Sequence, residues 1–439
     1  MIIFSHKVTP RLQYVALFLS DYYQHPFNLT SDGHVYDNEQ DFKIIYAEQR
    51  FSEQDLHIRP HTLLFETDKK KFTIECFSHN NYVAFFKAPG DMAFDLFASI
   101  FFLLSRYEEY LPHQKNKHGL FSHTNSLAFK EGFLRQPLVN IWLEEFRQVL
   151  QRKFAGIILQ IKGFQFIPTY DIDLPWCFKE KSLKVHYGNL IRSALKGQLK
   201  KAQLRINVVN GNAKDPYDSY EWMDSLHDRF HLSPVYFLLV ALKRGKHDKN
   251  PGIKNPQFRK LIRTLSQKYK TGLHPSWHSG DHEESLTDEK AVLEEVAGYP
   301  IDSSRQHFLR FELPHTFQCL QSAGIMHDYS MGYSAVNGFR ASIASDFYWY
   351  DLQKEETTGL KIHPFCFMDA SSFYYGSQSP GEAYEELMYY YATIKKVNGT
   401  MITLWHNNFL GTSEEFCGWK EAYEHFITSV CGSLYNLVD

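Results

Sequence analysis

The chain has 439 residues, in which 47 basic residues nearly balance 50 acidic residues, so the formal net charge is only −3. A nearly neutral chain has no global field that would draw it to nucleic acid or to an anionic membrane, so any charged ligand must be held locally. The length suits two domains rather than one. Aromatic residues make up 16% of the chain, which suits a thick core and also a sugar-binding cleft, because aromatic faces stack on sugar rings.

Neither a targeting segment nor a membrane-spanning segment is expected. The N-terminus carries Lys7 and Arg11 before any sustained apolar run, unlike a signal peptide. The longest apolar stretch, 94–104, has roughly 11 residues and is too short to cross a bilayer. The six cysteines include no Cys-x-x-Cys pair and are typical of reduced thiols. We therefore expect a cytoplasmic protein without a transmembrane segment or a nucleic-acid partner, and its oligomeric state stays open.

The first part of the chain, residues 1–160, mixes strand and helix signals in short pieces. β-Branched and aromatic residues broken by turn dipeptides predict strands within 28–46 and 63–86. Apolar periodicity predicts helices over 94–110 and 138–154. Segment 106–110 favours a solvated helix face with ion pairs at helical spacing. We expect a smaller α/β N-terminal domain of unknown role.

From residue 161 to residue 439 the pattern changes to a regular alternation of short apolar strands and amphipathic helices. Repeated strand–helix units form a parallel sheet covered by helices, and the length of this part favours a (β/α) barrel. Strands are predicted at 164–170, 234–240, 272–274, 327–330, 359–367 and 400–405. Helices are predicted at 221–230, 256–269, 287–296, 315–323 and 382–397.

Polar residues stand at the ends of several predicted strands, where the chemistry of such barrels is located. Asp171 and Asp173 end the strand at 164–170, and alternate side chains of a strand share a face. Carboxylates held side by side repel each other unless a cation or a shared proton offsets their charge. The other polar strand-end residues are His274, His363 and His406.

A second motif can complete a cation site with these acids. His274 and His278 are four positions apart, and one helical turn would place both imidazoles on one side. The alternative for this pair alone is two surface or capping histidines. Two histidines and one carboxylate form a ligand set for Zn²⁺ or a similar divalent cation, and such a site keeps an open position where water is polarised.

Four segments of this part resemble, in order, successive motifs of the polysaccharide deacetylases, the NodB-homology or carbohydrate esterase family 4 fold. The resemblance covers residues 163–439 and implies a distorted (β/α) barrel of that type. Segment 106–112 is similar to the uncharacterised region that precedes this domain in a group of bacterial proteins. The four segments are Thr169-Tyr-Asp-Ile-Asp173, His274-Pro-Ser-Trp-His278, Gly338-Phe-Arg340 and Leu404-Trp-His406.

The resemblance implies a role for each matching residue. Asp171 would be the general base, and the metal, with Zn²⁺ favoured, would be held by Asp173, His274 and His278. Ile172 separates two acids that are commonly adjacent in the family, so the roles of Asp171 and Asp173 can also be reversed.

The remaining implied residues surround the reacting groups. Arg340 would orient and ionise the base, and His406 would protonate the leaving amine, because a neutral-pH acid is most readily a histidine. Asp369 is similar to the acid that tunes the catalytic histidine of the family. Ala341 and Ser342 replace the usual Pro-Tyr after the arginine, so transition-state stabilisation would rest mainly on the metal.

The expected function is removal of N- or O-acetyl groups from a carbohydrate, such as a cell-surface polysaccharide or its precursor. One alternative is a non-catalytic carbohydrate-binding or scaffold protein on the same fold. The other is an amidohydrolase that acts on a non-sugar substrate. Against the scaffold stands the presence of Asp171, Asp173, His274, His278, Arg340 and His406.

Overall fold

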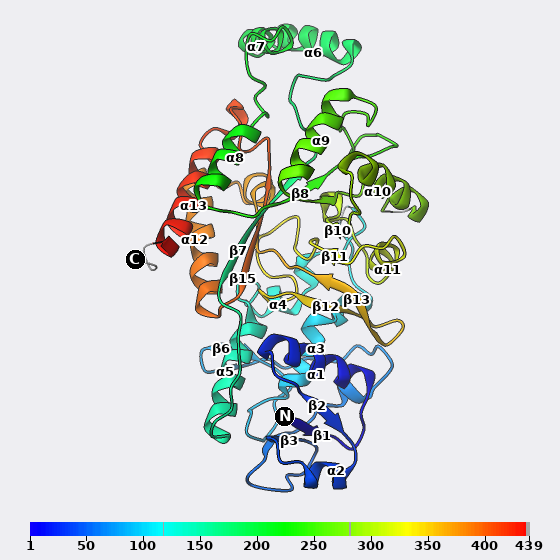
Figure 1. The fold of residues 1–439 in the computed structure, drawn as a ribbon, viewed down its shortest axis with the longest axis vertical. Helices are drawn as coiled ribbons and strands as arrows, with labels where there is room; N and C mark the ends of the chain where they lie inside the picture. The colour runs from blue at the N-terminus through cyan, green and yellow to red at the C-terminus, as the bar shows by residue number, and fades with distance from the viewer. Residues whose placement is uncertain (117, 281, 436–439) are drawn as a thin grey trace.

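The computed structural model describes residues 1–116, 118–280 and 282–435 (Figure 1). Its strands form a four-stranded, a two-stranded and a nine-stranded sheet. Neighbouring strands of the two larger sheets run parallel, except for the antiparallel pair β12–β13. The chain is therefore a mixed α/β protein with a parallel sheet, as the alternating pattern predicts. None of its described helices is long and apolar enough to cross a bilayer.

The first part of the chain contains the four-stranded sheet, in the order β2-β1-β3-β4. The helix predicted over 94–110 ends early because Arg106 adopts a left-handed backbone conformation. The strands are β1 (Ile2–Phe4), β2 (Asn28–Thr30), β3 (Lys43–Tyr46), β4 (Leu56–Ile58), β5 (Phe77–His79) and β6 (Tyr82–Ala84). The helices are α1 (Pro10–Tyr23), α2 (Gly33–Asn38), α3 (Leu96–Leu104), α4 (Leu127–Lys130) and α5 (Leu138–Lys153), with 3₁₀ turns η1 (Thr62–Phe65), η2 (Tyr107–Tyr110) and η3 (His123–Asn125).

The nine-stranded sheet follows the order β12-β13-β11-β10-β9-β8-β7-β15-β14. Within the described residues its ladder ends at β12 and at β14, so closure into a distorted barrel stays a prediction. The strands are β7 (Gln165–Ile172), β8 (Val235–Leu238), β9 (Lys270–Leu273), β10 (Ser303–Ser304), β11 (His327–Asp328), β12 (Phe347–Asp351), β13 (Glu356–Ile362), β14 (Phe367–Met368) and β15 (Thr400–His406).

Side chains cap the start of some helices of this part. Asn255 accepts the amide of Phe258 at the start of α9, and Ser379 forms a capping box with Glu382 at the start of α12. The helices are α6 (Leu183–Leu195), α7 (Leu199–Val209), α8 (Tyr220–Arg229), α9 (Pro256–Lys268), α10 (Glu283–Ala297), α11 (His315–Ser322), α12 (Pro380–Lys396) and α13 (Trp419–Tyr435). Shorter turns are η4 (His307–Leu309), η5 (Ser371–Tyr375) and η6 (Glu414–Phe416).

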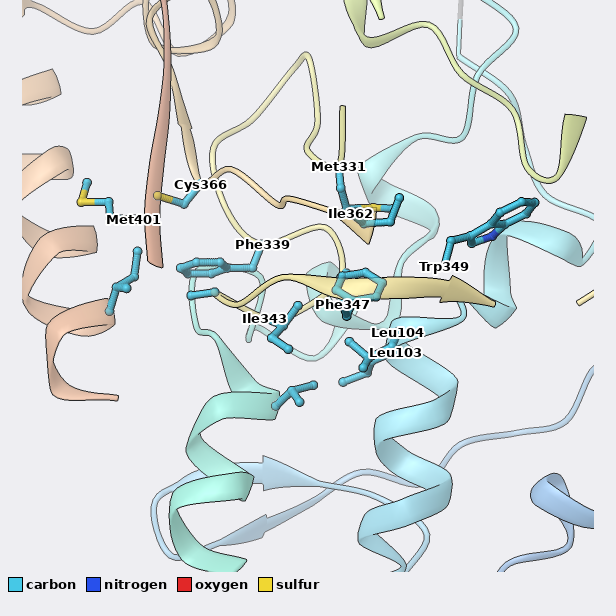
Figure 2. Close-up of a cluster of buried hydrophobic side chains, with 14 of the residues drawn as sticks. Leu103, Leu104, Met331, Phe339, Ile343, Phe347, Trp349, Ile362, Cys366 and Met401 are labelled. Carbon is cyan, nitrogen blue, oxygen red and sulfur yellow. The ribbon is translucent and has the colours of Figure 1, made fainter. Parts of the chain in front are cut away.

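The hydrophobic core is continuous between the first part of the chain and the nine-stranded sheet (Figure 2). Figure 2 shows Leu103 and Leu104 of α3 close to Phe347 of β12. An ion pair crosses the same boundary, since Arg11 of α1 donates two hydrogen bonds to the carboxylate of Glu355. The two parts share one apolar interior, and the division into domains 1–160 and 161–439 stays a prediction.

Candidate active site

Six neighbouring parallel strands bring their carboxyl ends to one edge of the sheet. In spatial order they are β10-β9-β8-β7-β15-β14. A cavity of about 410 Å³ lies there. Side chains from the ends of these strands line it or stand directly behind its lining: Asp171 from β7, Asp173 after β7, Asp248 after β8, His274 after β9, Arg305 and His307 after β10, Asp369 after β14, and His406 from β15.

The group with metal-binding geometry among the described residues consists of Asp173, His274 and His307, whose ligand atoms lie within 4.8 Å of one another. Asp173 Oδ1 is 3.1 Å from His274 Nε2, and Asp173 Oδ2 is 3.4 Å from His307 Nε2. Two ligands of a tetrahedral zinc ion, each about 2.0–2.2 Å from the metal, are roughly 3.4 Å apart. The observed spacings therefore suit such an ion.

The Nδ1 atom of each of the two histidine rings donates a hydrogen bond to a nearby acceptor. Nδ1 of His274 donates to the carbonyl oxygen of Arg305, and Nδ1 of His307 donates to Asp248 over 2.9 Å. Because a carbonyl oxygen can only accept, Nδ1 of His274 carries the proton of this bond, and Nε2 is the ring atom that faces Asp173. The buried Oδ1 of Asp173 has no hydrogen-bond partner in the described part of the chain. A cation held between Oδ1 and a neutral imidazole Nε2 would satisfy both atoms, so the donor set fits a divalent metal.

The pKa values of Asp173 and His307 depend on each other's charge. Burial by itself would raise the pKa of Asp173, but His307 and His274 hold that pKa well below its usual range. Burial lowers the pKa of His307, whereas the carboxylates of Asp173 and Asp248 outweigh burial and raise it to about 9. The two carboxylates thus draw positive charge to this position, as a proton or as a metal ion.

Asp171 stands beside this group with a different partner. It is 2% exposed, and its Oδ1 accepts a hydrogen bond of 2.9 Å from the guanidinium of Arg305. Arg305 is itself buried, donates to the carbonyl oxygen of Tyr329 and lies over the ring of Phe237. The second oxygen, Oδ2, is 3.6 Å from His274 Nε2. Asp171 is therefore a charge-balanced carboxylate next to the ligand set.

His406 is paired with Asp171 in the β7–β15 ladder and completes the cavity wall. The buried carboxylate of Asp369 accepts both the Nδ1 proton and the backbone amide of His406, each over 2.7 Å. Burial lowers the pKa of His406, but Asp369 and the other nearby carboxylates outweigh burial and raise it to about 10. Its Nε2, 3.7 Å from Asp173 Oδ2, is a proton donor at the cavity.

His278 lies outside this constellation, contrary to the expectation from its spacing. Pro275 follows His274, and residues 276–280 form a turn in which the amide of Gly280 donates to the carbonyl oxygen of Ser276. The two rings are therefore not on one helical face, and the ring of His278 packs against His282. The second histidine beside Asp173 and His274 is His307.

Arg340 also lies elsewhere. It donates hydrogen bonds of 2.9 and 2.6 Å to the two carboxylate oxygens of Glu109, which also pairs with Arg106. Arg106 and Glu109 are buried, so the solvated face expected for segment 106–110 is wrong. The guanidinium beside Asp171 belongs to Arg305 instead.

Sequence reasoning missed Arg305, His307 and Asp248. Strand β10 has only the two residues Ser303–Ser304, which form no apolar run, so no strand end was expected there. One signal was available, because Arg305 and His307 repeat the two-residue spacing of Asp171 and Asp173.

Residues 1–155 match the model of DUF7033, a family of unknown function. A segment is 34% identical over 84 residues to an orotate phosphoribosyltransferase from Aeromonas salmonicida (strain A449), covering 18% of this chain and only 38% of that relative. Two solved structures named as candidate polysaccharide deacetylases are similar. The one from Mycobacterium smegmatis has a TM-score of 0.39 at 15% identity and covers 62% of this chain and 84% of its own. The one from Pseudomonas aeruginosa PAO1 has a TM-score of 0.38 at 10% identity, covering 61% and 83%.

Proposed function

We propose that this protein is a metal-dependent hydrolase that removes acetyl groups from a carbohydrate. The observation that carries the proposal is a single cavity in which a three-residue ligand set lies beside a charge-balanced carboxylate and beside the imidazole of His406, which Asp369 orients. Metal-dependent hydrolysis of an acyl bond uses these parts, namely a polarising cation, a base for the attacking water and an acid for the leaving group.

Asp173, His274 and His307 would hold the metal through one carboxylate oxygen and two Nε2 atoms. One oxygen and two nitrogens suit Zn²⁺, with the fourth position left open. A bound divalent ion would polarise the water and the acyl carbonyl.

Asp171 would accept the proton of the attacking water. Its Oδ1 is held by Arg305, which leaves Oδ2 at the edge of the ligand set. The neighbouring groups of Asp171 and Asp173 also support different roles for the two acids. Asp171 already has a guanidinium to balance its charge, whereas Oδ1 of Asp173 faces Nε2 of His274 and has no hydrogen-bond partner among the described residues.

His406 would donate its Nε2 proton to the leaving amine or alkoxide. Asp369 fixes the ring by accepting from Nδ1, so the remaining proton is directed at the cavity. The carboxylate also keeps the imidazolium charged near neutral pH, which is the state that a general acid requires.

The cavity lining supports a carbohydrate substrate. Phe308 and Tyr374 line it and are 44% and 56% exposed, so part of each ring is accessible for stacking on a sugar ring. Met368 and Leu404 are buried in the lining and offer an apolar place for the acetyl methyl group.

Acetate release tests the proposal. Metal-loaded protein is incubated with N-acetylated chitooligosaccharides and, separately, with O-acetylated xylan, and free acetate is measured. We expect release from one of the two. Asp171→Asn should keep its metal and lose turnover by about a hundredfold or more, whereas Asp173→Asn should lose metal. Sugar binding without acetate release would favour the scaffold, and loss of metal from Asp171→Asn would reverse the two roles.

A further inference from the structure

Helices α6 and α7 form a hairpin that projects from the body of the protein, at the end opposite α2 and β1 (Figure 1). The base of the hairpin is fixed by Asp215, which is buried and whose carboxylate accepts the backbone amides of Cys177, Phe178 and Lys179. The hairpin is the next pair of helices after β7, and segment 177–179 at its base belongs to the connection that leaves the carboxyl end of that strand. It is therefore anchored at the sheet edge that carries the candidate active site.

Each helix of the hairpin exposes a row of large apolar side chains, and we name the two rows together the apolar stripe. Tyr187, Ile191 and Leu195 are 60%, 62% and 84% exposed, and because they are four residues apart they lie on one side of α6. Leu199 and Ile206, 68% and 38% exposed, lie seven residues apart on one side of α7. Single exposed apolar residues are normal on a protein surface, but a contiguous row marks an interaction site.

Positive charge is concentrated on the same hairpin. Glu180 is the one acid in the sequence from 179 to 214. Arg192 and Lys196 directly follow Ile191 and Leu195, about 100° further around the helix, so they flank the apolar stripe. The exposed basic residues, none of which forms an ion pair within the described ranges, are Lys184, Arg192, Lys196, Lys200 and Lys201.

We propose that the α6–α7 hairpin docks the protein on an anionic lipid surface. The apolar stripe would enter the boundary between headgroups and acyl chains, and the flanking basic residues would contact lipid phosphates. A second copy of the hairpin would bring like charges together, and a soluble polyanion offers no apolar interior for the stripe. This inference goes beyond the proposed function and does not depend on it.

Vesicle sedimentation of the full chain tests the docking. We expect binding to phosphatidylcholine vesicles that contain roughly a third phosphatidylglycerol and no binding to pure phosphatidylcholine. Joint replacement of Lys196, Lys200 and Lys201 by Glu should weaken binding at least tenfold, because each basic residue contributes to attraction at the surface. The matched control replaces the exposed Lys69, Lys70 and Lys71 by Glu. These residues belong to the first part of the chain and not to the hairpin, so the same change of charge should leave vesicle binding intact.

The apolar contribution has its own pair of variants. Ile191→Asp should weaken vesicle binding, and Ile158→Asp, at a position that is 74% exposed, should not. Circular dichroism confirms that each variant is folded. Equal binding to both vesicle types, equal loss in the control variants, binding to soluble polyphosphate but not to vesicles, or dimerisation that Ile191→Asp abolishes would each overturn the proposal.

Discussion

Arg305 and Arg340 are both buried and each pairs with a buried carboxylate, yet the two pairs serve different parts of the molecule. Arg305 faces Asp171 at the cavity, whereas Arg340 faces Glu109 of η2, which belongs to the first part of the chain. Removing one partner of a buried pair leaves the other charge uncompensated. Replacing one of the two arginines should therefore affect turnover or stability, depending on whether Asp171 or Glu109 loses its partner.

Arg305→Gln should lower kcat at least tenfold while the protein keeps its metal, because Asp171 loses the donor that orients it. Arg340→Gln should instead lower the free energy of unfolding by about 3 kcal/mol and leave kcat of the folded protein nearly unchanged. Acetate release, metal content and urea unfolding of both variants are the measurements. If Arg340→Gln loses turnover at unchanged stability, the role implied by the family resemblance is right and the one assigned here to Arg305 is wrong.

At the scale of elements, η2 also contains a buried carboxylate that depends on its partners. Glu109 accepts hydrogen bonds from both Arg106 and Arg340. Burial raises the pKa of Glu109, but the two guanidinium groups outweigh burial and lower it to about 2, from an ordinary value of 4.5. Because the folded value is the lower one, ionised Glu109 stabilises the folded protein above about pH 4.5, and this stabilisation is lost as the pH falls toward 2.

Glu109→Gln should therefore reduce the free energy of unfolding by about 3 kcal/mol at pH 7. The difference from the unmodified protein should shrink as the pH falls below about 4.5. Urea unfolding at a series of pH values measures this, with the exposed Glu385→Gln as control. A difference that does not change with pH would show that the ion pairs are not its source.

Elements with a strong local pattern could be predicted from the sequence. The helices expected at 138–154, 256–269 and 382–397 agree with α5, α9 and α12 to within two residues. Apolar periodicity supports all three, and a capping residue and a proline mark the start of the last two. Strand β10, with only two residues, has no such pattern, because its hydrogen bonds to neighbouring strands alone define it.

The candidate site could be predicted where its residues follow a strong strand. Asp171, Asp173 and His406 belong to β7 and β15 or follow them directly, and the cavity brings them together. His307 follows the two-residue β10, and the partner of Arg340 lies 231 positions away at Glu109. Contacts of this kind depend on the packing of distant segments, which periodicity and spacing do not report.

At the scale of the whole molecule, the shared core decides how the two parts unfold. Leu104 of α3 is fully buried in the same cluster as Phe347 of β12. We expect the full chain to unfold in one cooperative transition. Leu104→Ala should lower its free energy of unfolding by about 2–5 kcal/mol and shift that transition as a whole. Two separate transitions, of which only one moves, would mean that residues 1–160 form an independent domain.

The central claim is that the strand ends build a metal centre from Asp173, His274 and His307. Zinc affinity of His307→Ala and His278→Ala, measured side by side by competition with a chelator, tests it most directly. His307→Ala should bind zinc at least roughly a hundredfold more weakly, because it removes one of three ligands, and His278→Ala should bind zinc like the unmodified protein. Weak binding in His278→Ala together with normal binding in His307→Ala would contradict the claim.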